Sequence, residues 1–199
     1  MSFRKEEKLY IKPDHILELK KFFKDNSAEN LYKPRIIKSL YFDNLSLDMY
    51  DDSIEGVVPR KKIRVREYPE AKDNKYYLEI KHSSVEGRFK TRKVIGKEKI
   101  EFFKKAGYFD DRYGTCFPNF YVSYNREYLI MKDVRISIDT NIIYQNFRSN
   151  LKYSDRNCIV ELKTSINKNN DDLINDFPFQ TVLPARLAGD GDPLDVIIF

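Results

Sequence analysis

The chain contains no tryptophan, two cysteines, two histidines and seven glycines among its 199 residues. No stretch approaches the ~18 apolar residues that a membrane-spanning helix requires, and the N-terminal sequence lacks the apolar segment of a signal peptide. Cys116 and Cys158 form no Cys-x-x-Cys pair, so we expect reduced thiols in a cytoplasmic protein. His15 and His82 have no metal-ligand spacing, which argues against a zinc site and against histidine-based acid–base catalysis.

Charged residues, by contrast, are abundant at 34% of the chain, with 36 Lys and Arg against 31 Asp and Glu. Residues 183–199 hold one arginine and three aspartates, so the excess of positive charge belongs to residues 1–182. A basic domain suggests a polyanionic partner, and charge alone leaves nucleic acid and phosphate compounds both open. The 14 tyrosines and 14 phenylalanines favour a folded domain over disorder.

The pattern of apolar residues predicts few helices and many strands. Helical spacing and end signals indicate helices over 13–25 and 97–106, the second ended by Gly107, and one further turn over 170–176. This mixture predicts an α+β fold built on an antiparallel sheet or barrel. The expected strands cover residues 3–11, 36–43, 60–68, 75–82, 88–95, 120–130, 134–144 and 157–164.

The charged residues alternate with apolar residues along these strands. Every even position from 60 to 66 is cationic, whereas Ile63 and Val65 occupy odd positions, so the two sets project to opposite faces. Segments 77–81 and 159–163 repeat this alternation with a glutamate and a lysine. Each strand alone fits an ordinary half-exposed sheet. Together they favour a closed barrel with a charged lumen and an apolar outer face covered by helices or loops.

Glutamates on the cationic faces indicate what kind of anion the barrel would hold. Glu6, Glu79 and Glu161 share faces with Lys and Arg, and a nucleic-acid surface gains nothing from such carboxylates. Beside phosphate-binding cations, a carboxylate can hold a divalent metal that bridges phosphate oxygens. Each glutamate alone fits an ion pair with a neighbouring lysine. As a group they indicate metal-assisted phosphoryl chemistry.

These segments, in order, resemble the VTC (vacuolar transporter chaperone) domain, a branch of the triphosphate tunnel metalloenzymes. Residues 4–8 match the family's opening Arg-x-Glu-x-Lys strand, and the resemblance covers roughly residues 3–182. The other matching segments are 39–43, 64–68, 78–81, 90–92, 124–126, 135–139 and 160–163.

The resemblance implies an eight-stranded antiparallel tunnel with a few flanking helices, which binds ATP or polyphosphate together with Mn²⁺ or Mg²⁺. It assigns Glu161 to the metal, and we add Glu6 and Glu79 as further carboxylates of the lumen. Within the set of implied phosphate ligands, the catalytic residues would be Arg64, Arg66, Lys81, Arg126 and Arg135. The full set of phosphate ligands is Lys8, Arg64, Arg66, Lys81, Lys90, Arg92, Arg126 and Arg135.

The chain departs from the family after residue 182. A last tunnel strand containing Ser-Lys-Tyr is expected there, but the sequence continues with Leu183-Pro184-Ala185-Arg186-Leu187. We therefore expect the last strand to be missing or replaced, with residues 1–182 forming the tunnel domain. The acidic tail over 183–199 resembles a fragment of soluble inorganic pyrophosphatase and is too short to be a domain. Its Asp190, Asp192 and Asp195 are weaker metal candidates.

The expected function is a metal-dependent polyphosphate polymerase, which transfers the terminal phosphoryl group of ATP to a growing polyphosphate chain. A tripolyphosphate or polyphosphate hydrolase with the same fold is one alternative. A module that binds polyphosphate or inositol phosphates without turnover is another. We expect no nucleic-acid partner, and any membrane partner would be a separate protein.

Overall fold

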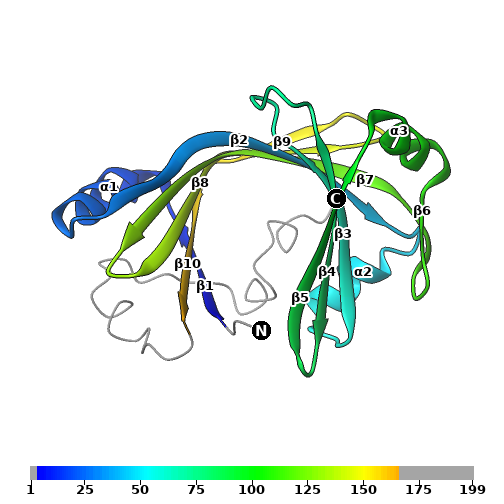
Figure 1. Cartoon of the computed structure of the whole chain (residues 1–199), viewed down its shortest axis with the longest axis horizontal. Coiled ribbons are helices and arrows are strands. Elements are labelled where there is room, and N and C mark those ends of the chain that lie inside the picture. The colour runs from blue at the N-terminus through cyan, green and yellow to red at the C-terminus, as the bar shows by residue number, and fades with distance from the viewer. Residues whose placement is uncertain (1–3, 166–199) are drawn as a thin grey trace. The chain divides into compact units, whose positions relative to one another are not determined.

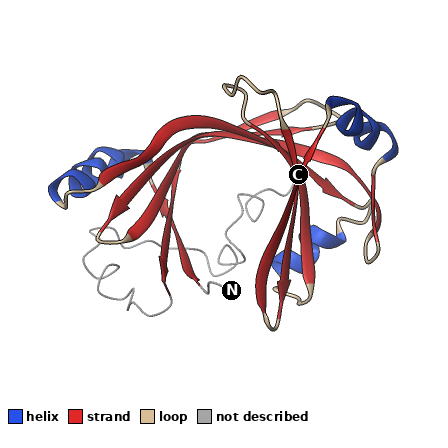
Figure 2. Ribbon diagram, in the orientation of Figure 1, coloured by secondary structure: helices blue, strands red, loops and turns tan. Residues whose placement is uncertain are grey.

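The computed structural model describes residues 4–165, which form two compact units. Unit 1 contains residues 4–35, 124–142 and 155–165, and unit 2 contains residues 36–123 and 143–154. Strands dominate the described residues (Figure 2). The helices are a short 3-10 turn, η1 (Pro13–His15), followed by α1 (Ile16–Asp25), α2 (Asp48–Ile54) and α3 (Lys97–Ala106).

The strands form one sheet whose order is β1-β10-β8-β7-β2-β3-β4-β5, with β6 paired to β7 and β9 paired to β8. Five neighbouring pairs along this order have a defined register, and all five are antiparallel. The bounds are β1 (Arg4–Ile11), β2 (Glu29–Asp43), β3 (Arg60–Glu67), β4 (Tyr76–Ser84), β5 (Gly87–Ile95), β6 (Tyr108–Asp110), β7 (Gly114–Met131), β8 (Val134–Asn146), β9 (Lys152–Asp155) and β10 (Cys158–Ser165).

The predicted fold class, an antiparallel sheet with a few helices, is confirmed, and the eight expected strands are the eight along this order. Along the strand order of the described residues, β1 and β5 are the two end strands, and closure of the barrel stays a prediction. The segment in which we expect a replaced last strand, 183–199, lies outside the described residues, as does the predicted turn over 170–176. Among the described helices, none has the length and apolarity to cross a membrane.

The core of unit 1 lies between α1 and one face of the strands. Leu9 on β1, Ile136 on β8 and Val160 on β10 are buried together with Leu19 and Phe23 of α1. Leu19 and Phe23 stand four residues apart and so share one helix face. Figure 1 shows α1 (blue) beside these strands. Since alternate residues face opposite ways, the other face of β1, β8 and β10 carries the charged residues.

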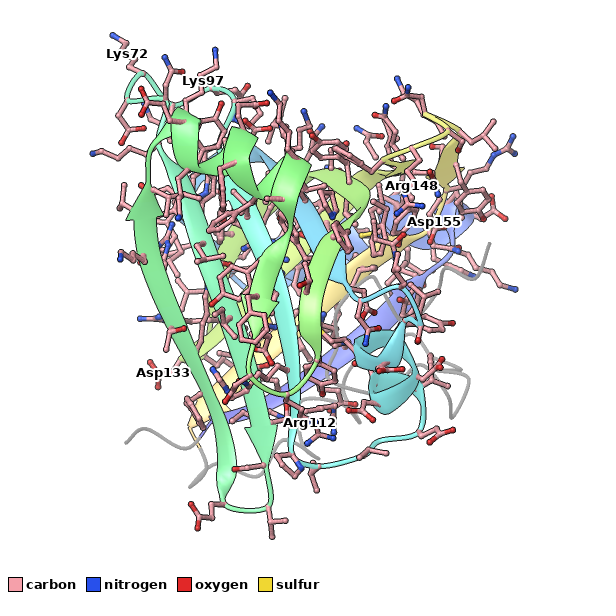
Figure 3. All side chains as sticks on the ribbon, turned by 90° about the vertical axis from the view of Figure 1, so that its right-hand side faces the viewer. Lys72, Lys97, Arg112, Asp133, Arg148 and Asp155 are labelled. Atoms are coloured by element: carbon pink, nitrogen blue, oxygen red, sulfur yellow. The ribbon has the colours of Figure 1, made fainter. Side chains whose placement is uncertain are left out.

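The core of unit 2 has the same arrangement. Ile63 and Val65 of β3 are buried with Met49 of α2 and with Ile100 and Phe103 of α3. Figure 3 shows α3 across the strands, with Lys97 at the beginning of the helix. Helices therefore cover the apolar face of the strands in each unit, as the sequence predicted, and the even positions of β3 are left to the opposite face.

The boundaries of α2 and α3 have local causes. Asp43 accepts hydrogen bonds from the backbone N–H groups of Met49 (3.1 Å) and Tyr50 (2.9 Å), which fixes the beginning of α2. Gly107 ends α3 with φ 81°, and its N–H donates to the carbonyl of Phe103 over 3.0 Å. A Cβ at position 107 would lie 2.6 Å from Thr115 Cγ2, so close packing and positive φ both require glycine there.

Candidate functional site

Four cations on β3 are buried on the face away from the helices. They occupy alternate positions of the strand, and each is only 6% or 7% exposed. Burial of an ionised side chain is costly unless charge or hydrogen bonds compensate it. The four are Arg60, Lys62, Arg64 and Arg66.

The register carries this cationic face across β4 and β5. Lys62 lies opposite Lys81, and Lys81 lies opposite Lys90, so three lysines form one row across the strands. In the adjacent row, Arg64 lies opposite Glu79, which lies opposite Arg92. Like charges in directly opposite positions destabilise a sheet, so the lysine row is suited to an anion placed over it.

Glu79 is the carboxylate at the centre of this face and is 1% exposed. Its Oε2 accepts a hydrogen bond from Arg64 Nε over 2.9 Å and lies 3.8 Å from Arg66 Nε. Its Oε1 accepts from Lys90 Nζ over 2.5 Å and lies 3.4 Å from Arg92 Nε. One carboxylate therefore contacts four cations, which leaves the cluster strongly positive.

These contacts change the pKa values of the cluster. Burial alone would raise the pKa of Glu79, but the charges of Arg64 and Arg66 and the hydrogen bond from Lys90 outweigh burial and lower it to about 2. The pKa of Lys90 is lowered by burial and by the two arginines, against the attraction of Glu79. The Glu79 carboxylate is therefore ionised at every physiological pH.

Aromatic and hydroxyl side chains fix the arginines of this face. Arg64 donates from a terminal guanidinium nitrogen to the Tyr41 hydroxyl over 2.7 Å, and the Tyr41 ring stacks on Phe120 with centroids 5.3 Å apart. The Arg92 guanidinium lies 3.8 Å from the centroid of Tyr77, within cation–π range. These contacts hold the guanidinium groups in set orientations.

Unit 1 carries a second charged group on β1 and β10. Lys163 Nζ lies 2.9 Å from Glu6 Oε1 and 3.4 Å from Glu161 Oε1, so one ammonium joins the two carboxylates. Ser137 Oγ donates to Glu161 Oε2 over 3.3 Å. Lys8 lies opposite Glu161 in the register of β1 and β10. Unlike Glu79, Glu161 shares its surroundings with a second carboxylate.

Two arginines stand beside this group. Arg126 donates two hydrogen bonds to the Asp139 carboxylate, each over 2.6 Å, in the bidentate geometry that planar guanidinium favours. Arg135 lies opposite Lys163 in the register of β8 and β10 and is exposed. Both arginines line a cavity of about 210 Å³ within unit 1, together with Glu161 and Lys163.

The neighbours of each carboxylate decide how well it suits a metal. Across residues 4–165, no three His, Cys, Asp or Glu side chains gather as a ready-made site. Both oxygens of Glu79 contact cations, a setting that favours orientation of arginines over metal ligation. Glu6 and Glu161 already surround one positive charge, that of Lys163. Their oxygen chemistry fits a hard divalent cation, which commonly takes one or two carboxylates and completes its shell with substrate phosphates and water.

The predicted site residues thus fall into two groups. The group in unit 2 consists of Arg64, Arg66, Glu79, Lys81, Lys90 and Arg92. The group in unit 1 consists of Glu6, Lys8, Arg126, Arg135 and Glu161. Motif comparison missed Lys62 and Lys163, although each stands two positions from a predicted residue and so shares its face. Asp190, Asp192 and Asp195 lie outside the described residues. The roles of all these residues stay predictions.

Comparisons with known proteins agree with this fold. Residues 3–180 match the family model of the VTC domain, and no curated protein sequence matches the chain. A candidate adenylate cyclase from Bacillus halodurans shares the fold with a TM-score of 0.56 at 10% identity, covering 88% of this chain and 86% of that one. A conserved hypothetical protein from Pyrococcus furiosus has a TM-score of 0.51 at 17% identity, covering 87% and 85%. A candidate adenylyl cyclase from Hippeastrum, which reveals a dominant triphosphatase activity, has a TM-score of 0.52 at 13% identity, covering 88% and 86%.

Proposed function

Because the chain belongs to the VTC domain family, we propose that it is a metal-dependent polyphosphate polymerase. In this reaction the terminal phosphoryl group of ATP passes to the end of a polyphosphate chain, and ADP leaves. The transfer needs no covalent enzyme intermediate, since the donor and acceptor phosphates have only to be aligned and their charge stabilised.

The observation that carries this proposal is the charge balance on one face of β3, β4 and β5. Glu79 is the one carboxylate that these three strands place on that face, against eight cations. A polyphosphate carries negative charge along its length, so it is a ligand that offsets many cations at once. The cations are Arg60, Lys62, Arg64, Arg66, Lys81, Arg88, Lys90 and Arg92.

The residues divide into roles that follow from their contacts. Arg64 and Arg66, oriented by Glu79 and by the Tyr41 and Ser39 hydroxyls, present donor groups to phosphate oxygens. Lys81 and Lys90 add charge from the lysine row. Arginine suits such a task because its planar fork pairs bidentately with phosphate oxygens.

In unit 1, Arg126 and Arg135 are proposed as further phosphate ligands, with Lys8 beside Glu161. Glu161, aided by Glu6, would hold Mg²⁺ or Mn²⁺. When bound, such an ion neutralises charge on the phosphates. The Ser137 hydroxyl, which donates to Glu161, would orient that carboxylate. Lys163, which contacts both Glu6 and Glu161, would either move away when the metal binds or remain as a further phosphate ligand.

A hydrolase of tripolyphosphate or polyphosphate is the second candidate. The Hippeastrum protein with this fold reveals a dominant triphosphatase activity, and the same cations would serve when water is the acceptor. Both reactions fit a cytoplasmic enzyme, which the two free and buried cysteines support. A binding module without turnover would use the same face of β3, β4 and β5.

A single variant separates catalysis from binding. Glu161→Gln should abolish ADP release from ATP with Mn²⁺, while binding of inorganic tripolyphosphate in the absence of metal is retained. Glu18→Gln, which changes an exposed carboxylate on α1, is the matched control and should keep full turnover. Equal turnover in the Glu161→Gln variant and the parent would overturn the metal role, and no turnover in the parent would favour the binding module.

A further inference from the structure

The cavity in unit 1 has an aromatic wall as well as a cationic one. Leu31 and Tyr32 of β2 and Tyr128 of β7 line it together with Arg126, Arg135 and Lys163. Tyr32 is 55% exposed, a large exposure for an aromatic side chain inside such a ring of charges. An exposed aromatic ring beside cations is the combination that binds a flat ring attached to an anion.

The two tyrosine rings are held in a fixed relationship. Their centroids lie 5.6 Å apart and their planes cross at 84°, an edge-to-face pair. Arg35 Nε donates to the Tyr128 hydroxyl over 2.8 Å, and its guanidinium lies 5.0 Å from the Tyr128 ring centroid. Tyr128 is therefore anchored, and Tyr32 stands against it with more than half of its surface open.

The size of the cavity limits what part of a ligand it can hold. Sites for whole drug-sized ligands usually enclose about 300–1,000 Å³, and this cavity encloses about 210 Å³. It accommodates one planar ring better than an entire nucleotide. The adjoining charge provides for the rest of the ligand, because Arg135 lines the cavity and has no hydrogen-bond or ion-pair partner within residues 4–165.

We propose that Tyr32 and Tyr128 form a subsite for the base of a nucleoside triphosphate, with Arg135 binding its phosphates. This inference rests on the proposed function, and it adds a site that selects a nucleoside triphosphate as the phosphoryl donor. Stacking of a base on an aromatic ring tolerates different bases, since each has a flat face. The subsite would therefore distinguish a nucleotide from inorganic tripolyphosphate more strongly than one nucleotide from another.

The test compares two ligands that share three phosphates and differ in the nucleoside. Dissociation constants of ATP and of inorganic tripolyphosphate, each with Mg²⁺, are measured by titration calorimetry on the full chain. Tyr32→Ala should weaken ATP by about tenfold and leave tripolyphosphate unchanged. Tyr32→Phe, which keeps the ring, should restore the affinity for ATP. Tyr153→Ala removes a similarly exposed tyrosine of unit 2, stacked on Tyr144, and should change the affinity for neither ligand.

An equal loss of both ligands in Tyr32→Ala would overturn the subsite and assign Tyr32 a structural role. Unchanged affinity of Tyr32→Ala for ATP would also overturn the subsite. In either case, polymerase activity in the parent would leave the proposed function standing. Conversely, a parent without turnover whose ATP affinity falls selectively in Tyr32→Ala would keep the subsite and remove the polymerase.

Discussion

Arg64 Nε donates to Glu79 Oε2 over 2.9 Å, and both side chains are almost completely buried on the charged face of unit 2. The pair is not neutral as a group, because Arg66, Lys90 and Arg92 contact the same carboxylate. Glu79 therefore reduces repulsion among cations without cancelling their charge. The excess of positive charge on this face attracts a polyanion.

The lowered pKa of Glu79 predicts an acid dependence of stability. Its folded-state value of about 2 lies below the ordinary 4.5, so its contribution is fully present above pH 4.5 and is lost as the pH falls toward 2. The shift corresponds to about 3 kcal/mol of unfolding free energy. Urea denaturation between about pH 6 and about pH 2, which spans that window, measures the free energy of unfolding of the parent and of Glu79→Gln. The difference between the two should shrink as the pH falls. Parallel pH profiles would contradict the assignment.

At neutral pH, Glu79→Gln should destabilise unit 2 by about 3–5 kcal/mol, since it leaves buried cations without their carboxylate. Added tripolyphosphate should then raise the melting temperature of the variant more than that of the parent, because the anion replaces the lost charge. Thermal unfolding with and without the anion tests this. An equal rise in both proteins would mean that the anion binds away from Glu79.

Asp139→Asn tests the bidentate pair in unit 1. Asp139 is 3% exposed and both of its oxygens accept from Arg126, so removal of its charge should cost about 3–5 kcal/mol. Glu127→Gln is the control, because Glu127 pairs with the half-exposed Lys20 over 3.3 Å, and an exposed pair contributes at most about 1 kcal/mol. Urea denaturation measures the loss of unfolding free energy in each variant. Equal losses would contradict the larger contribution assigned to the buried Asp139 pair.

The end of α3 provides a steric prediction. Gly107→Ala should lower stability more than Gly56→Ala, although both positions have positive φ, 81° and 72°. A Cβ at 107 would meet Thr115 and the Cys116 carbonyl, whereas nothing lies within 4 Å of one at 56. Gly107 also has ψ 175°, and this combination of φ and ψ is essentially restricted to glycine, so backbone strain of about 1–3 kcal/mol adds to the steric clash at this site. Equal melting temperatures of the two variants would show that the β7 backbone yields without cost.

Alternation of residue types made much of this fold predictable. The odd positions Ile63 and Val65, set against the even cations of β3, were enough to assign both faces of that strand. The helix α2 was missed because its seven residues bury one large apolar side chain, Met49, and its beginning is fixed by Asp43 on the preceding strand. Strands β6 and β9 are three and four residues long, too short for a periodic signal.

The sequence predicted which residue types form the candidate site, but it did not predict their contacts. Spacing placed Glu79 among cations, but it could not show that four of them contact one carboxylate, since this depends on the register of β3, β4 and β5. For the same reason, the sequence did not predict the cavity beside Tyr32. Its wall combines side chains from β2, β7, β8 and β10, and no local pattern joins residues so far apart in the chain.

Phosphorus NMR of the parent protein with ATP and Mg²⁺ distinguishes a polymerase from a hydrolase, because it resolves orthophosphate, ADP and the interior phosphates of a chain in one spectrum. With a polymerase, we expect the ATP signals to decline while the ADP and interior-chain signals grow together. Growth of orthophosphate with no interior-chain signal would contradict the polymerase and identify a hydrolase.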